Sequence, residues 1–221
     1  MAKLLNEHVE KQVRDVFEEL KAPVHILFFG SQDGCEYCED TRQLVEEVAA
    51  LSDKISLSVY DLETDAETAR TYQIDKSPAL VIAGKEGDQI IDYGVRFFGI
   101  PAGHEFTSLI QDIVLVSGRD SGLSPSTREF LKSLKQPVHL EVFVTPTCPY
   151  CPRAVILAHM MAMETPMIKA DMVEAMEFPA LADRHHVSGV PHTVINDGAG
   201  NVVGAVPEAS LVNAIRQALR V

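Results

Sequence analysis

The four cysteines of this 221-residue chain form two Cys-x-x-Cys pairs, and each pair is followed by a proline at the same distance. The landmarks are Cys35, Cys38 and Pro78 in the first copy and Cys148, Cys151 and Pro191 in the second. In each copy the proline lies forty residues after the second cysteine, and the copies are displaced by 113 positions. This spacing indicates that one redox-competent unit occurs twice, and it makes dithiol–disulfide chemistry the leading hypothesis.

The repeat extends through the predicted secondary structure. A β-rich run leads into each pair, at residues 23–29 and 137–143, and an amphipathic helix precedes each run. A helix, a short strand and a helical segment follow each pair, before the proline opens a buried strand. One hairpin partner strand and a final helix complete each copy, so that the order α-β-α-β-α-β-β-α is expected twice.

The predicted fold class is therefore α/β, with two tandem units that each have a mixed central sheet flanked by helices. In the first copy the hairpin partner is expected at residues 89–93. The polar stretch 117–122 predicts the boundary between units 1–118 and 119–221.

Composition and charge limit the partners of the chain. A net charge of −13 argues against nucleic-acid binding, which requires neutralisation of phosphates by Lys and Arg, and it disfavours anionic membranes. The first residues become charged before an apolar region forms, and no apolar run approaches the roughly 20 residues of a membrane span. We therefore expect a cytoplasmic location, where thiols are kept reduced and a Cys-x-x-Cys pair is catalytic or metal-binding rather than a structural staple.

The position of each pair predicts the roles of its cysteines. A Cys-x-x-Cys that opens a helix places its first sulfur near free backbone N–H groups and the positive end of the helix dipole, which favour a thiolate. Cys35 and Cys148 are therefore the predicted nucleophiles. Cys38 and Cys151 lie about one turn further on, and they are the predicted resolving thiols that release the mixed disulfide.

The residues between the cysteines predict a difference between the two pairs. Glu36 adds a negative charge beside Cys35, whereas Pro149 stands at the same place beside Cys148. A neighbouring negative charge disfavours a thiolate. We therefore expect Cys148 to have the lower thiol pKa and its disulfide to be the more oxidising.

The chain resembles the thioredoxin fold and, in tandem form, the two-domain protein disulfide oxidoreductases (glutaredoxin-like proteins) of thermophilic archaea and bacteria. The segments most specific for this resemblance are residues 145–152, 171–179 and 99–106. The resemblance implies that Pro78 and Pro191 are cis-prolines packed against redox-active pairs. It also implies that Ser77 and Val190 offer backbone groups to an extended protein substrate.

The resemblance further implies that electrons come from a separate thioredoxin-reductase-like flavoprotein. The glycine-rich stretch 198–204 lacks the GxGxxG spacing and lies in a predicted hairpin turn, so no flavin or nicotinamide cofactor is expected in the chain itself. A related tandem module carries electrons in bacterial alkyl hydroperoxide reductase systems, and it normally retains only one active pair. Two intact pairs favour the oxidoreductase.

Three alternatives remain open from the sequence. The four cysteines together form a possible Cys₄ zinc site, although each pair has its own βαβ setting and the separation is far wider than in zinc ribbons. The same thiols also suit an electron carrier dedicated to a peroxiredoxin. The third alternative, a non-catalytic binding or chaperone module, is disfavoured by the four retained cysteines.

Several other residues have both a structural and a functional interpretation. His25 and His139 occupy equivalent places in the opening strands, where a hydrogen-bonded sheet histidine is the better prediction. His192 follows the second proline and is a candidate to assist the Cys148 thiolate. Glu141 is a candidate buried proton acceptor or a structural carboxylate. The methionines at 160–176 suit a core-packed helix better than an adaptable binding surface.

Overall fold

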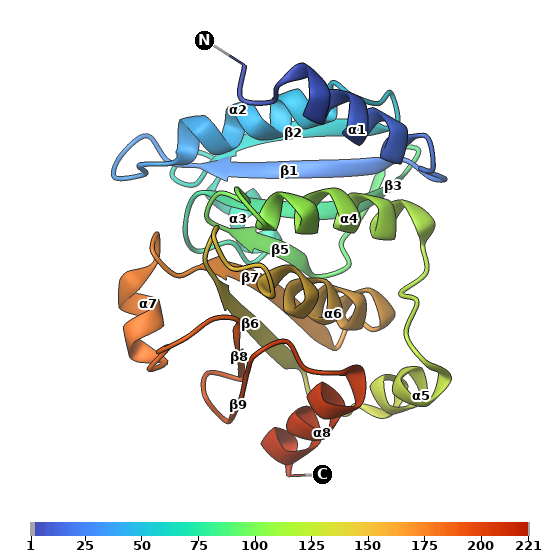
Figure 1. Ribbon diagram of the computed structural model, residues 1–221, viewed down its shortest axis with the longest axis vertical. Helices are drawn as coiled ribbons and strands as arrows, with labels where there is room; N and C mark the ends of the chain where they lie inside the picture. The colour runs from blue at the N-terminus through green and yellow to red at the C-terminus, as the bar shows by residue number, and fades with distance from the viewer. Residues whose placement is uncertain (1–2, 221) are drawn as a thin grey trace.

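The computed structural model describes residues 3–220, which form two α/β units joined through one continuous sheet (Figure 1). The first unit contains α1 (Glu7–Phe17), β1 (Val24–Gly30), α2 (Cys38–Ala49), β2 (Ile55–Asp61), α3 (Ala66–Thr71), β3 (Ala79–Glu86), β4 (Gln89–Ile91), β5 (Val95–Phe98) and α4 (Glu105–Gly118). The second contains α5 (Pro125–Ser133), β6 (Val138–Val144), α6 (Cys151–Glu164), β7 (Ile168–Glu174), α7 (Pro179–Arg184), β8 (His192–Ile195), β9 (Gly200–Val203) and α8 (Glu208–Leu219).

The strands of the described chain follow the order β2-β1-β3-β5-β7-β6-β8-β9, with β4 paired to the far end of β3. Strands β1 and β2 are parallel, and β3 runs antiparallel to both β1 and β5. Strand β5 is parallel to β7, which is parallel to β6. Strands β1 and β6 therefore run in the same direction, and their carboxyl ends lie at the same edge of the sheet.

The junction between the units depends on β5, which was not predicted from the sequence. Only one partner strand was expected after β3, at 89–93, but the structure has β4 and then β5. Gly94 separates the two strands, with φ +78°, and a Cβ atom there would lie 2.8 Å from the carbonyl oxygen of Ile168. A glycine at this position allows the backbone of β5 to approach β7. The carbonyl of Gly94 accepts a hydrogen bond from the Ala170 amide at 2.9 Å.

Helices cover both faces of the sheet, and the alternation of side chains along the strands separates two apolar clusters. Ile26 and Phe28 of β1 face one cluster, to which α1, α2, α4, α5, α6 and α8 contribute buried residues. Leu27 and Phe29 face the other, which contains residues of α3 and α7. In Figure 1, α1, α2, α4 and α6 lie in front of the sheet. The two cysteine pairs lie on that face, at the N-terminal ends of α2 and α6.

Local signals explain further features of the second unit. Ser124 caps α5 by accepting a hydrogen bond from the Thr127 amide, and Pro125 occupies the first turn. The short strand expected after the second cysteine-bearing helix is β7, which runs from Ile168 to Glu174. The hairpin turn around Gly198 lies between β8 and β9, as expected. Among residues 3–220 no helix is long and apolar enough to cross a membrane.

Candidate active site

Each cysteine pair lies in the turn between a strand and the helix that follows it. Cys38 is the first residue of α2, and Cys151 is the first residue of α6. Both pairs form disulfides, with Cα–Cα distances of 5.4 Å for Cys35–Cys38 and 5.5 Å for Cys148–Cys151. Each pair thus lies at a helix start, where the first backbone N–H groups have no partner within the helix.

The first cysteine of each pair is the more accessible one. Cys35 is partly buried and Cys38 is 9% exposed. Cys148 is 8% exposed, while Cys151 is completely buried. A thiolate arriving from a substrate therefore reaches Cys35 or Cys148 before the second sulfur of the pair.

A cis proline lies beside each pair. The Ser77–Pro78 and Val190–Pro191 peptide bonds are both cis, as the resemblance implied. Both prolines are buried, and the residues before them are partly buried. The Sγ atom of Cys148 lies 3.7 Å from the carbonyl oxygen of Val190. The register pairs of β3 and β8 begin at Ala79 and His192, so Ser77 and Val190 precede the paired part of their strands.

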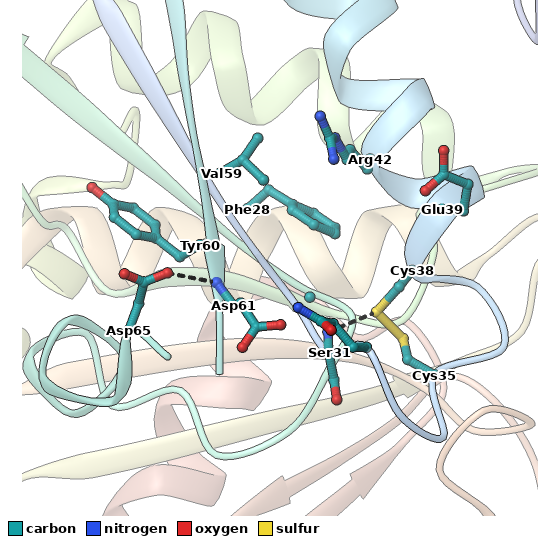
Figure 2. A pocket seen from close by; sticks show the side chains of 12 residues that line it. Phe28, Ser31, Cys35, Cys38, Glu39, Arg42, Val59, Tyr60, Asp61 and Asp65 are labelled. Atoms are coloured by element: carbon teal, nitrogen blue, oxygen red, sulfur yellow. Dashed lines mark hydrogen bonds between the residues drawn. A yellow bond between two sulfur atoms is a disulfide. The ribbon is translucent and has the colours of Figure 1, made fainter. Parts of the chain in front are cut away.

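Cys35 borders two cavities. The first, which we call the α2–β2 cavity, has a volume of about 560 Å³ and lies between the start of α2 and strand β2 (Figure 2). Its lining residues include both cysteines of the pair, with Glu39, Arg42 and Asp61. Figure 2 shows the Ser31 amide directed at Cys38, to whose sulfur it donates at 3.4 Å.

The second cavity bordering Cys35, which we call the inter-unit cavity, has a volume of about 600 Å³ and lies between the two units. The first unit contributes residues 34–37, Asp40, Ser77, Pro78, Ile100 and Ala102, and the second contributes Pro146, Glu174, Met176, Glu177 and Pro179. Cys35, the cis-proline turn and the end of β7 thus line one space. Met176, 74% exposed, lies at this cavity, whereas Met161 and Met172 are buried in the core.

Two carboxyl groups of the second unit are held in this cavity by backbone amides. Glu177 Oε1 accepts a hydrogen bond from the Ile100 amide at 2.7 Å, and Glu174 Oε2 accepts one from the Glu177 amide at 2.6 Å. Burial raises the pKa of Glu177 to about 7, with smaller contributions from the neighbouring charges of Glu174 and Glu36. Burial also raises the pKa of Glu174.

Glu174 and Glu177 were not identified as site residues from the sequence. Both lie in segment 171–179, whose sequence indicates only a resemblance to the oxidoreductase family. Nothing in the local pattern indicates that the end of β7 lies beside Cys35, because the contact depends on the pairing of β5 with β7.

The structure favours the structural interpretation for the two strand histidines. Both ring nitrogens of His25 lie within hydrogen-bond distance of serine hydroxyls, at 2.7 Å from Ser56 and 2.9 Å from Ser58. His139 Nε2 lies 2.5 Å from Asp171 Oδ2. Both rings are therefore held by neighbouring strand residues, as expected from the sequence.

Neither His192 nor Glu141 lies on the side of the sheet that carries the second disulfide. Side chains alternate along a strand, so His192 shares the face of Val194, whereas Cys148 and Cys151 belong to the cluster on the opposite face. The pKa of His192 is lowered by burial and then by the charge of His185. Its proposed assistance to the Cys148 thiolate is therefore not supported by the geometry.

Glu141 has a structural environment on that same face. It is 7% exposed, and its Oε2 atom lies 3.7 Å from His185 Nε2. The strand register places Glu141 beside Asp171, which is hydrogen-bonded to His139. These neighbours favour the structural carboxylate over a proton acceptor for the cysteines.

The positions of the two pairs are incompatible with a shared zinc ion. From β1 the sheet continues through β3, β5 and β7 before it reaches β6, which makes four strand spacings or roughly 19 Å between the two turns. A Cys₄ zinc site needs all four sulfurs about 2.3 Å from one ion. Each pair is instead a separate disulfide in its own unit.

Comparison with known proteins agrees with this geometry. The family model described as "Thioredoxin domain" matches residues 23–111 and 138–217, one segment in each unit. The chain belongs to the thioredoxin-domain family. The chain is similar to a protein disulfide oxidoreductase from Aeropyrum pernix, whose crystal structure superimposes with a TM-score of 0.86. The two sequences are 36% identical, and the match covers 96% of this chain and 92% of that one. This thioredoxin-domain chain is thus also a member of the two-domain protein disulfide oxidoreductases.

Relatives of a second kind share the same tandem arrangement. The N-terminal domain structure of the alkyl hydroperoxide reductase AhpF from Enterococcus faecalis is 27% identical with a TM-score of 0.86, covering 96% of this chain and 99% of that one. The corresponding protein of Pseudomonas aeruginosa is 27% identical over 203 residues, which is 91% of this chain but 35% of that protein. This thioredoxin-domain chain spans about a third of the length of the curated relatives it matches.

Proposed function

We propose that the chain catalyses thiol–disulfide exchange on protein substrates, through two dithiol sites that reduce, form or isomerise disulfides. The observation that carries this proposal is the repeated constellation of an accessible first cysteine, a buried second cysteine at a helix start and a cis-proline turn beside them. The 36% identity to a protein disulfide oxidoreductase over nearly the whole chain supports it.

In the reducing direction, the thiolate of Cys35 or Cys148 attacks one sulfur of the substrate disulfide. The substrate S–S bond breaks, a mixed disulfide forms, and one substrate sulfur leaves as a thiolate. Cys38 or Cys151, after losing its proton, then attacks the first cysteine of its own pair. That attack releases the second substrate thiolate and leaves the protein disulfide, so that two electrons have passed to the substrate. The reverse sequence oxidises a substrate dithiol.

The cis-proline turns have a proposed role in holding the substrate. Ser77 and Val190 precede the paired parts of β3 and β8 and lie beside their disulfides. Their backbone groups are placed to pair with an extended substrate segment, with Pro78 and Pro191 packed beneath it. Recognition through main-chain groups suits a broad range of protein substrates.

The proposed domain limits remain 1–118 and 119–221. Helix α4 ends at Gly118, and α5 begins at Pro125 after a connection without regular elements. Both disulfides open at the same edge of the joined sheet, which suits simultaneous contact with one large substrate. We place the activity in the cytoplasm, where a dithiol pair is maintained by reduction, with a thioredoxin-reductase-like flavoprotein as the proposed electron donor.

A direct test is the reduction of insulin by dithiothreitol with the wild type, Cys35→Ser, Cys148→Ser and the double variant. We expect catalysis by the wild type, a larger loss in Cys148→Ser than in Cys35→Ser, and only the uncatalysed rate in the double variant. Catalysis that survives in the double variant contradicts dithiol chemistry. Failure of the wild type itself contradicts the general oxidoreductase function.

A second candidate function is electron transfer to a peroxiredoxin. The similarity to the N-terminal domain of the alkyl hydroperoxide reductase AhpF favours it, because that domain matches along nearly its whole length. The two functions use the same thiols and differ in substrate range. Rapid reduction of one peroxiredoxin together with poor insulin reduction favours the carrier, whereas comparable rates on unrelated disulfides favour the oxidoreductase.

A further inference from the structure

We propose that the inter-unit cavity beside Cys35 binds a lysine or arginine side chain of the substrate polypeptide, with Glu174 and Glu177 of the second unit as its acceptors. The first redox site then selects disulfides that have a basic residue close to the cysteine. This inference rests on the proposed function, since it concerns the substrates of the same site.

The first observation is a buried carboxylate oxygen that has no partner among the described residues. Glu174 is 3% exposed and lines the cavity, and its Oε1 atom forms no hydrogen bond there. Its other oxygen is occupied by the Glu177 amide. An unsatisfied buried acceptor is costly, and a charged donor from a ligand compensates it better than a neutral one.

The second observation is that the fold makes room for these carboxyl groups against the first unit. Gly99 has φ +93°, and a Cβ atom there would lie 2.6 Å from Glu174 Cβ and 2.8 Å from Glu177 Oε1. The Ile100 amide then fixes Glu177 at 2.7 Å. Segment 99–100 of the first unit therefore receives the carboxyl groups of the second unit beside the Cys35 turn.

The third observation is the charge of the cavity wall. Glu36 and Asp40 line it from the Cys35 side, facing Glu174 and Glu177 from the end of β7, and none of the described lining residues is lysine or arginine. The wall also contains Tyr37, Met176 and three prolines, which suit the aliphatic part of a long basic side chain. Charge and shape thus favour a cation carried on an alkyl stem.

The second redox site provides an internal comparison within the same chain. Pro149 and Arg153 occupy the positions that correspond to Glu36 and Asp40 in the first site. The first turn of α6 contains no acidic residue, whereas that of α2 contains Glu39 and Asp40. Cys148 is therefore expected to show no preference for a basic substrate.

The preference is expected to depend on pH. Glu177, with a pKa of about 7, is mostly neutral at pH 6 and mostly charged at pH 8. The other titratable groups that face the cavity are Glu36, Asp40 and Glu174, the phenol of Tyr37, whose pKa is raised mainly by Glu36, and, in the reduced protein, the Cys35 thiol. The ionisation of Cys35 affects both peptides equally and does not change the ratio of their rates. Selectivity for a cation therefore increases as the pH rises through 7.

The test uses the full chain with Cys148→Ser and Cys151→Ser, reduced by dithiothreitol, desalted and mixed with disulfide-linked peptides. Two peptides differ only in having arginine or glutamine next to cysteine, and the rate of substrate thiol release gives a second-order rate constant for each. We expect the arginine peptide to react about tenfold faster at pH 8, as a charge-assisted hydrogen bond predicts, and the ratio to fall at pH 6.

Variants locate the effect. Glu177→Gln, alone and combined with Glu174→Gln, should reduce the ratio at pH 8 to within about twofold of one. Glu39→Gln is the matched control. Glu39 lies beside Asp40 in the first turn of α2, but its side chain lines the α2–β2 cavity, so this variant should keep the wild-type ratio of the two rate constants. The ratio is taken within each variant, so a loss of folded protein does not change it.

The outcomes separate this inference from the proposed function. Equal reduction of both peptides through Cys35 overturns the inference and leaves the oxidoreductase function intact. A ratio that Glu39→Gln abolishes as fully as Glu177→Gln also overturns it, because the preference then arises from general surface charge. Reduction of neither peptide contradicts the proposed function of the first site itself.

Discussion

The two redox turns have the same backbone plan but different surroundings. Each contains a disulfide at a helix start beside a cis proline. Cys35 is partly open and borders two cavities whose walls are rich in carboxylates. Cys148 is 8% exposed, and the dipeptide beside it is uncharged, with Tyr150 63% exposed to solvent. A repeated motif therefore sets the chemistry of both sites, while their neighbours set how each site meets a substrate.

Each unit supplies neighbours to the redox turn of the other. Glu174 and Glu177 of the second unit face Cys35. In return, the His104 amide of the first unit donates to the carbonyl of Pro146, two residues before Cys148, at 2.9 Å. Glu105 follows His104 and is almost completely buried at the start of α4. The junction of the two units is thus part of both sites.

The largest expected effect concerns Glu105, which we compare with Glu177. Burial raises the pKa of Glu105 from 4.5 to about 7, so the native state holds more protons than the unfolded state between these pH values. The contribution of this carboxyl to stability therefore falls as the pH rises through that window. In urea unfolding, the free energy of unfolding of Glu105→Gln minus that of the wild type should increase by about 2–3 kcal/mol between pH 5 and pH 8.

The matched substitution Glu177→Gln should show a smaller change of the same sign. Glu177 has a similar pKa but is more exposed, and solvent screening reduces its contribution to under about 1 kcal/mol. An equal pH-dependent change in the stability of both variants, or a change of opposite sign for Glu105→Gln, contradicts the contrast between a fully buried carboxyl group and one that faces a cavity.

The next effect concerns the contact between the first unit and the turn of the second site. Gly103 has φ +60°, and a Cβ atom there would lie 2.3 Å from the backbone oxygen of Pro146. Gly87 has φ +59° with nothing near its Cβ position, so Gly87→Ala measures the conformational cost alone. We expect Gly103→Ala to destabilise the chain by about 2 kcal/mol more than the control in urea unfolding.

Gly103→Ala should also slow insulin reduction by Cys148 more than reduction by Cys35, measured in variants that retain one pair. The new methyl group meets Pro146, which lies two residues before Cys148 and reaches the Cys35 site only as part of the wall of the inter-unit cavity, so a smaller slowing of Cys35 is also expected. Equal slowing of both sites indicates a general loss of packing and contradicts a local effect on the second turn.

The smallest effect concerns the thiol pKa values of the two nucleophiles. The negative charges of Glu36, Glu39 and Asp40 disfavour a thiolate at Cys35. Burial disfavours a thiolate at Cys148, so the difference between the two thiol pKa values is small. We still expect alkylation by iodoacetamide to give the lower pKa for Cys148. Glu36→Gln should lower the value for Cys35 by roughly 0.2–0.7 units, as expected for one charge at a helix start. A lower pKa at Cys35 in the wild type contradicts this ranking.

Much of the fold and part of the site were predictable from the sequence because they depend on local signals. The spacing of Cys35, Cys148 and the two prolines predicted the repeat, and the helix starts follow from capping residues such as Ser124. The position of His192 was not predictable in this way. Its place after Pro191 indicated proximity to Cys148, but strand alternation directs its side chain to the other face of the sheet.

The sequence by itself determined that a dithiol unit occurs twice, because the motif, the strand before it and the helix after it are encoded within short stretches of chain. Tertiary structure decided how the units combine. Strand β5 is four residues long and contains Arg96, so its local pattern is weak, and it becomes a strand by pairing with β7, whose residues lie about 75 positions away. That pairing places Glu174 and Glu177 beside Cys35, because contacts across a sheet are fixed by strand order and not by distance along the chain.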